Sequence, residues 1–121
     1  MAKVLIVDDS PAQVLSLKEL IEGWGHETLT AADGDRAFEI ACEDHPDVIL
    51  MDVVMPGMNG FQVTRKLSKN QHTKGIPVIF ISNRNGEADR VWGMRQGAIA
   101  YITKPVNSDD LLSAISDAIP N

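Results

Sequence analysis

Residues 48–60 read VILMDVVMPGMNG and carry the clearest indication of the fold. Four consecutive apolar residues, Val48–Met51, are followed by Asp52 and by a loop that contains a proline and two glycines. Continuous apolar runs of this length are typical of strands that are buried on both faces of a parallel sheet. The stretch therefore predicts a central parallel strand that ends at an aspartate.

Short apolar runs recur on both sides of this stretch. They predict further strands at Val4–Val7, Glu27–Ala31, Val78–Ile81 and Ala100–Thr103. Segments with helical spacing separate the runs, so that a strand and a helix alternate five times along 121 residues. This alternation predicts an α/β fold in which helices cover both faces of a parallel sheet.

Two of the helical segments carry a clear apolar stripe. The first opens after Ser10-Pro11, a cap followed by a first-turn proline, and its stripe consists of Val14, Leu17, Ile21 and Trp24. In the last segment we expect the inner face to hold Leu112, Ile115 and Ile119. The segments at 37–43, 61–67 and 88–96 are compatible with helices but less regular.

Composition excludes several classes of protein. The length fits one domain, residues 1–121, with no linker and no room for an output domain. The net charge of −6 argues against a nucleic-acid partner, and no apolar run is long enough for membrane insertion. A single cysteine, Cys42, excludes an internal disulfide, and the N-terminus lacks a signal peptide, so we expect a cytoplasmic protein.

Polar residues follow the predicted strands at the points where they end. These residues are Asp8, Asp9, Asp52, Ser82 and Lys104. Each alone is commonly a cap, a turn residue or a solvated charge, but ligands of open α/β sheets bind at this edge. Three carboxylates repel one another unless cations intervene, and carboxylates are ligands that Mg²⁺ prefers. A carboxylate can also accept a phosphoryl group, and Asp52 is our candidate for that nucleophile.

These motifs resemble those of the response-regulator receiver domains over the whole chain. The matching pieces are VLIVDDS, LMDVVMPGMNG, the serine after PVIFI and the Lys-Pro pair after GAIAYIT. The resemblance implies a doubly wound, flavodoxin-like (βα)5 fold with a five-stranded parallel sheet in the order 2-1-3-4-5.

The resemblance also implies a role for each residue of the site. Asp52 would accept a phosphoryl group from a sensor histidine kinase or a histidine phosphotransfer domain. Mg²⁺ (or Mn²⁺) would be bound by Asp9, Asp52 and the backbone carbonyl of Val54, with Asp8 holding a metal-bound water. Lys104 would pair with the phosphoryl oxygens, and the peptide bond before Pro105 is a candidate for the cis form.

The implied switch consists of Ser82, which would move toward the phosphoryl group, and Tyr101, which would turn inward with it. The output face would be formed by the helix at 88–96, the strand at 100–103 and the last helix, and it would bind a downstream target protein. The segments MDVVMPGMNGFQVTRKL and VWGMRQGAIAYITKPV look most like single-domain regulators of the chemosensory systems that drive type IV pili.

Three positions depart from the usual pattern of the family. Asn83 stands where the family generally has Ala or Gly, Val54 stands where a polar side chain is frequent, and Arg84 places a long cation near the mouth of the site. We expect these residues to tune the chemistry. In particular, Val54 cannot align an attacking water, which predicts slow loss of the phosphoryl group.

The residues are also compatible with other functions. A Mg²⁺-dependent phosphatase would place Asp-x-Asp after the first strand, but Asp8 and Asp9 are adjacent here. A flavin or nucleotide binder would need a phosphate-cradling loop, and the sequence contains neither G-x-G-x-x-G nor a P-loop. A phosphate sink or a constitutive, unphosphorylated interaction module are the alternatives within the family. We expect no enzymatic turnover beyond self-phosphorylation and slow self-dephosphorylation.

Overall fold

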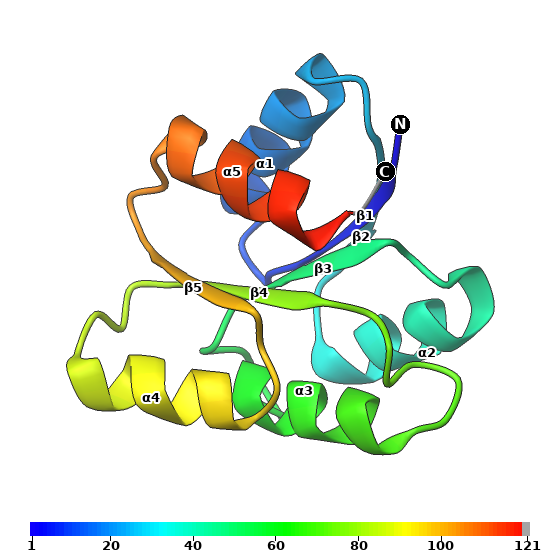
Figure 1. Cartoon of the computed structure of the whole chain (residues 1–121), viewed down its shortest axis with the longest axis vertical. Helices are drawn as coiled ribbons and strands as arrows, with labels where there is room; N and C mark the ends of the chain where they lie inside the picture. Colours follow the sequence, from blue (N-terminus) through cyan, green and yellow to red (C-terminus); the bar gives the residue numbers. More distant parts are fainter. Residues whose placement is uncertain (120–121) are drawn as a thin grey trace.

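The structure of the protein, a computed structural model, describes residues 1–119. Within this range five strands alternate with five helices (Figure 1). The strands are β1 (Lys3–Val7), β2 (Glu27–Ala31), β3 (Val48–Met51), β4 (Val78–Ser82) and β5 (Ala100–Thr103). The helices are α1 (Pro11–Gly23), α2 (Gly34–Asp44), α3 (Gly60–Lys69), α4 (Glu87–Arg95) and α5 (Ser108–Ala118).

The five strands form one parallel sheet in the order β2-β1-β3-β4-β5. β3 lies at its centre, with Met51 opposite both Val7 of β1 and Phe80 of β4. The predicted α/β architecture and the strand order implied by the family are both confirmed. Because all strands run in the same direction, their carboxyl ends meet at one edge of the sheet.

The sheet lies between two layers of helices, with α1 and α5 on one face and α2, α3 and α4 on the other (Figure 1). Successive side chains of a strand point to opposite faces. In β1, for example, Leu5 and Val7 join the core beneath α2 and α3, whereas Val4 and Ile6 join the core beneath α1 and α5. The continuous apolar runs in the sequence thus reflect strands that are buried on both sides. Full burial of each such side chain stabilises the fold by about 1.5–3 kcal/mol.

Side-chain caps fix the starts of four helices. Ser10, Asp33, Asn59 and Asn107 each accept hydrogen bonds from backbone amides in the first turn of the helix that follows. α4 differs, because Gly86, the residue before its first turn, offers no side-chain cap, and because the helix buries only Gly93. No helix within residues 1–119 is long and apolar enough to cross a membrane.

The predicted inner face of the last helix is partly wrong. Leu111 and Ile115 are fully buried, and Ile119, just beyond the end of α5, is half-buried against the same core, whereas Leu112 is 38% exposed. Leu111 and Ile115 are four residues apart and therefore lie on one face of the helix, and this face packs against the core together with Ala114 and Ala118.

Candidate functional site

Backbone hydrogen bonds that continue past the strand ends hold the predicted site residues at one edge. The Asp8 amide donates to the carbonyl of Ala31 at 3.1 Å, and the Asp52 amide donates to the carbonyl of Val7 at 2.9 Å. The Lys104 amide donates to the carbonyl of Ser82 at 2.8 Å. The sheet ladder therefore fixes the backbone of Asp8, Asp52 and Lys104.

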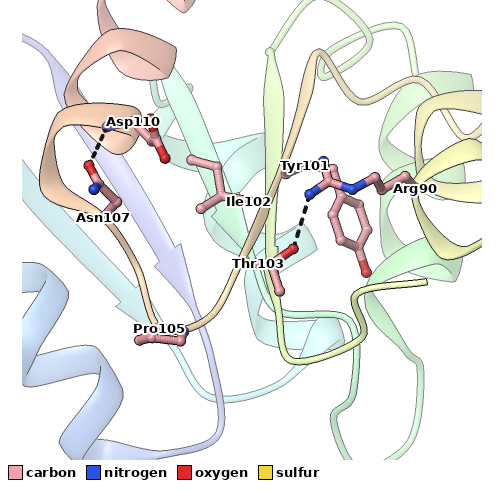
Figure 2. Close-up of a pocket in the computed structure, with 7 residues that line it drawn as sticks. All are labelled: Arg90, Tyr101, Ile102, Thr103, Pro105, Asn107 and Asp110. Atoms are coloured by element: carbon pink, nitrogen blue, oxygen red, sulfur yellow. Dashed lines mark hydrogen bonds between the residues drawn. The ribbon is translucent and has the colours of Figure 1, made fainter. Parts of the chain in front are cut away.

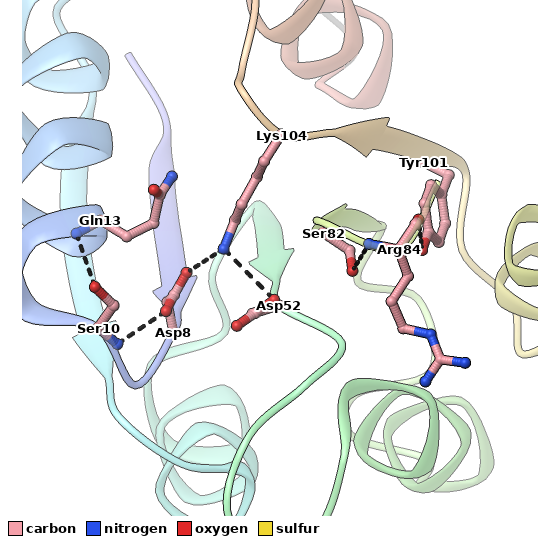
Figure 3. Close-up of polar contacts among 8 residues, drawn as sticks. All are labelled: Asp8, Ser10, Gln13, Asp52, Ser82, Arg84, Tyr101 and Lys104. Carbon is pink, nitrogen blue, oxygen red and sulfur yellow. Dashed lines mark hydrogen bonds and ion pairs between the residues drawn. The ribbon is translucent and has the colours of Figure 1, made fainter. Parts of the chain in front are cut away.

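The carboxylates of Asp8 and Asp52 meet the ammonium group of Lys104 at this edge (Figure 3). The Lys104 Nζ lies 3.1 Å from Asp8 Oδ2 and 3.6 Å from Asp52 Oδ1. Asp8, Asp9 and Asp52 each offer an oxygen within 4.8 Å of the others. Asp8 and Asp52 are buried, whereas Asp9 is exposed. One ammonium leaves this cluster with a net charge of −2, and an oxygen-rich, negatively charged cluster of this kind fits a hard divalent cation.

Burial and repulsion act together on the Asp52 carboxyl group. The pKa of Asp52 is raised above its ordinary value, first by burial and then by the negative charge of Asp8. Lys104 and a hydrogen bond from the Val53 amide oppose this rise without cancelling it. The ionised form of Asp52 is therefore held at a cost that an additional cation would relieve.

The start of α3 approaches the Asp52 backbone closely. The Gly60 amide donates to the carbonyl of Val53 at 2.8 Å. A Cβ atom at Gly60 would lie 2.2 Å from the carbonyl oxygen of Asp52. Only glycine fits at this position, so Gly60 allows the loop after β3 to fold tightly beneath the acidic cluster.

Ser82 and Tyr101 are both connected to the backbone of Arg84, on the other side of Asp52 from Asp8 (Figure 3). The Arg84 amide donates to Ser82 Oγ at 3.1 Å. The Tyr101 hydroxyl donates to the Arg84 carbonyl at 2.6 Å. Ser82 is fully buried and Tyr101 is 7% exposed, and burial raises the pKa of Tyr101. The loop after β4 thus ties the two residues together.

Comparison with known proteins identifies the chain. The family of response regulator receiver domains matches residues 4–116. The chain belongs to this family. It is 49% identical over 116 residues to Protein PilH of Pseudomonas aeruginosa, covering 96% of each chain. It is also 33% identical to Protein PilG of the same organism, covering 98% of this chain and 88% of PilG.

A solved structure agrees with this assignment. The chemotaxis protein CheY4 of Vibrio cholerae superposes with a TM-score of 0.91 at 32% identity, covering 98% of this chain and 99% of CheY4. The protein is therefore a receiver domain of a two-component response regulator with the flavodoxin-like fold.

The three departures from the family pattern lie around the site of this receiver domain. Val54 is 60% exposed, and Asn83 and Arg84 are exposed as well. The Arg84 side chain points away from Asp52 (Figure 3). Its Nε donates to Asp89 Oδ1 at 3.0 Å. The Lys104–Pro105 peptide bond is cis.

Two residues of the receiver domain that the sequence did not single out support Tyr101. Arg90 donates to the carbonyl of Tyr101 at 3.3 Å and to Thr103 Oγ1 at 3.2 Å. A Cβ atom at Gly93 would lie 3.0 Å from the Tyr101 ring and 3.1 Å from Phe80, so glycine lets α4 lie close to these rings. A glycine inside an apparent helix was the available signal for Gly93, and nothing in the spacing pointed to Arg90.

A pocket of about 280 Å³ lies between α4, β5 and the start of α5 (Figure 2). Its lining combines a cation, a carboxylate and apolar groups: Arg90, Tyr101, Ile102, Thr103, Pro105, Asn107 and Asp110. The pocket adjoins Tyr101, whose hydroxyl is bound to the loop after β4. It therefore lies on the predicted output face and next to the predicted switch.

Proposed function

We propose that this receiver domain accepts a phosphoryl group on Asp52 from a phosphohistidine and that phosphorylation changes its binding to a downstream protein. The observation that carries the proposal is the position of the Asp52 carboxylate. It ends the central strand, beside the carboxylates of Asp8 and Asp9 and 3.6 Å from the ammonium of Lys104.

In the proposed transfer a carboxylate oxygen of Asp52 forms the new bond to phosphorus. The bond between phosphorus and the donor imidazole breaks, and the imidazole nitrogen keeps the electron pair. Lys104, already within reach of Asp52, would neutralise charge on the phosphoryl oxygens. The acyl phosphate would later be lost to water, so the protein acts on itself and is not a turnover enzyme.

The acidic cluster fits Mg²⁺ or Mn²⁺. Asp9, Asp52 and the Val54 carbonyl would bind the ion, and Asp8 would hold one of its water ligands. When bound, the ion supplies positive charge that stabilises the transferring group. The buried, repelling carboxylates of Asp8 and Asp52 support this assignment independently of the family.

The proposed switch passes from Ser82 to Tyr101 through the loop after β4. A phosphoryl group on Asp52 would attract the Ser82 hydroxyl, which now accepts a hydrogen bond from the Arg84 amide. Moving that loop would break the contact between the Arg84 carbonyl and the Tyr101 hydroxyl. Tyr101 lines the pocket of Figure 2, so its movement would alter the α4–β5–α5 face that binds the target.

We place this regulator in a cytoplasmic chemosensory pathway that controls type IV pili. The 49% identity to PilH over nearly the whole chain supports this placement. The kinase partner would be a sensor histidine kinase or a histidine phosphotransfer domain.

Phosphotransfer profiling tests the proposal. Wild type and Asp52→Asn are incubated with phosphorylated histidine kinases and phosphotransfer domains, and label on the regulator is followed over time. We expect rapid labelling of wild type and none of Asp52→Asn. Equal labelling of the two would overturn the assignment of Asp52, and no labelling of wild type by any donor would favour a constitutive interaction module.

Pull-downs distinguish a signal carrier from a phosphate sink. Beryllofluoride mimics the phosphoryl group on an aspartate. A partner that is retained only in its presence identifies a signal carrier, whereas rapid labelling without any such partner supports the sink.

A further inference from the structure

The positive charges of this acidic protein are concentrated in one part of the fold. Seven of its 11 Lys and Arg residues, but only two of its 17 acidic residues, lie between Gly60 and Ile99. This segment, which contains α3, β4 and α4, therefore carries a net charge of +5, while the rest of the chain carries −11.

Apolar side chains are exposed within the same region. On α4, Val91, Trp92 and Met94 are 47%, 45% and 44% exposed. Arg95 lies three residues after Trp92 and four residues after Val91. Its side chain is therefore a neighbour of both on the helix surface. On the adjacent α3, Arg65 and Lys69 are exposed and four residues apart. We call these residues the α3–α4 patch: Arg65, Lys69, Val91, Trp92, Met94 and Arg95.

Contacts between α3 and α4 order the centre of the patch. The Arg65 guanidinium carbon lies 6.0 Å from the centre of the Trp92 ring, and Arg65 Nε donates to Gln96 Oε1 at 2.9 Å. The buried Gln96 in turn donates to the Trp92 carbonyl at 3.2 Å. A tryptophan held in place loses less conformational freedom when a partner covers it.

We propose that the α3–α4 patch binds an acidic segment of a partner protein, with Trp92 packing against an apolar anchor of that segment. Trp, Met and Arg are enriched at the centres of protein interfaces, and Trp and Arg dominate their binding energy. The positive rim would select a negatively charged segment and speed its association. Trp92, the centre of the patch, lies on the α3 side of α4 against Arg65, whereas Arg90 lines the pocket beside β5. Binding at the patch does not require phosphorylation of Asp52.

The charge distribution favours a protein over the other polyanions. Nucleic acids and anionic lipid surfaces extend over a wider area than the patch. The net charge of −11 on the rest of the chain would therefore repel them. The patch also offers a single aromatic side chain, Trp92, which is too few for a stacking platform.

Selection from a displayed library of random peptides tests the proposal on the unphosphorylated protein. We expect the selected peptides to be rich in Asp and Glu around an aromatic or aliphatic residue. Their affinity should fall as salt is added, because the attraction is between exposed charges. Their amide shift perturbations should lie on α3 and α4.

Two double variants with the same net charge provide the matched control. Lys69→Glu with Arg95→Glu, and Lys18→Glu with Arg36→Glu, both change the net charge from −6 to −10. We expect at least about a tenfold loss of peptide affinity for the first pair and for Trp92→Ala, and less than about a twofold change for the second pair. Circular dichroism checks folding, and Lys69→Gln with Arg95→Gln replaces the first pair if it unfolds.

Several outcomes would overturn the proposal. These are peptides without acidic bias, no selected binder, equal losses in the two double variants, and shifts confined to the pocket beside β5. Sedimentation with phosphatidylglycerol vesicles is measured in parallel. Sedimentation that is lost in Trp92→Ala would replace the peptide partner with a membrane surface.

Discussion

The carboxylate of Asp52 is buried and is also repelled by neighbouring carboxylates. Its side chain lies among Asp8, Asp9 and Lys104 at the end of β3, and its pKa is raised. Under the proposed function Asp52 is the nucleophile and must be ionised, so the fold would hold a charge that burial disfavours. Functional sites commonly give up stability in this way.

This exchange predicts that Asp52→Asn is more stable than wild type at neutral pH in the absence of divalent cations. The ordinary pKa of this carboxyl group is 3.8, and its pKa in the folded protein is higher. As the pH rises through 3.8, the group therefore ionises in the unfolded chain before it ionises in the folded protein. Wild type therefore loses stability between that value and the raised pKa, whereas Asn stays neutral. Lys104 still pairs with Asp8 in the variant.

Thermal melts in EDTA measure the effect of Asp52→Asn. The Tm of Asp52→Asn should be higher than that of wild type at neutral pH. The two Tm values should converge as the pH falls toward the ordinary aspartate pKa. The exposed Asp117→Asn serves as the control for a lost carboxylate. A lower Tm for Asp52→Asn at neutral pH would contradict the argument.

Val54 provides a second prediction at the residue scale. Its side chain is 60% exposed beside the site and offers no hydrogen bond to a water that attacks the phosphoryl group. Val54→Asn should supply that contact and shorten the lifetime of the phosphorylated protein by roughly tenfold, or about 1.4 kcal/mol of activation free energy. The lifetime is followed by loss of label after the donor is removed. An unchanged or longer lifetime would refute the role of Val54, and Val54→Ala is the control for altered size.

At the scale of elements, two glycines at helix ends should respond in opposite ways to alanine. A Cβ atom at Gly60 would collide with the Asp52 carbonyl at 2.2 Å, whereas a Cβ atom at Gly23, at the end of α1, would meet nothing within 4 Å. Gly60→Ala should lower the free energy of unfolding by about 1–3 kcal/mol. Gly23→Ala should raise it by about 0.5–1 kcal/mol because helical alanine is favoured over glycine.

Denaturant unfolding measures both glycine variants, and phosphate uptake separates their effects on the site. Gly60→Ala should also slow labelling of Asp52, because the backbone of that residue must shift. Gly23→Ala should label like wild type. Equal stability of the two variants would show that the start of α3 is not fixed by the close approach to Asp52.

The ends of several strands could be predicted from the sequence, whereas the inner face of one helix could not. Strands β2, β3 and β5 begin and end where they were predicted to. In β3 burial on both faces leaves no polar position, so the apolar run marks both of its ends. The inner face of α5 was harder to predict from the sequence. The spacing of the apolar residues fits either leucine, because Ile115 lies four residues after Leu111 and three after Leu112, and only packing against the core distinguishes the two.

For the molecule as a whole, the strand-end residues were predictable because a parallel sheet brings every carboxyl end to one edge. Asp8, Asp52 and Lys104 are 44 to 96 residues apart in the chain and yet lie within contact distance. The strand order came only from the resemblance to the family. The contacts of Arg90 and Gly93 with Tyr101 could not be predicted, since they depend on how α4 lies against β5.

The acidic edge also links the stability of the whole molecule to divalent cations. An ion that binds only the folded state stabilises it by about 1.4 kcal/mol when its concentration is ten times the Kd. Mg²⁺ and Mn²⁺ should therefore each raise Tm by roughly 5 °C at that concentration. Asp9→Asn removes an exposed carboxylate of the cluster and should abolish most of this shift, while Asp109→Asn, at the start of α5, should keep it. Calorimetry with and without EDTA measures the shift, and equal shifts in the two variants would place the ion outside the cluster of Asp8, Asp9 and Asp52.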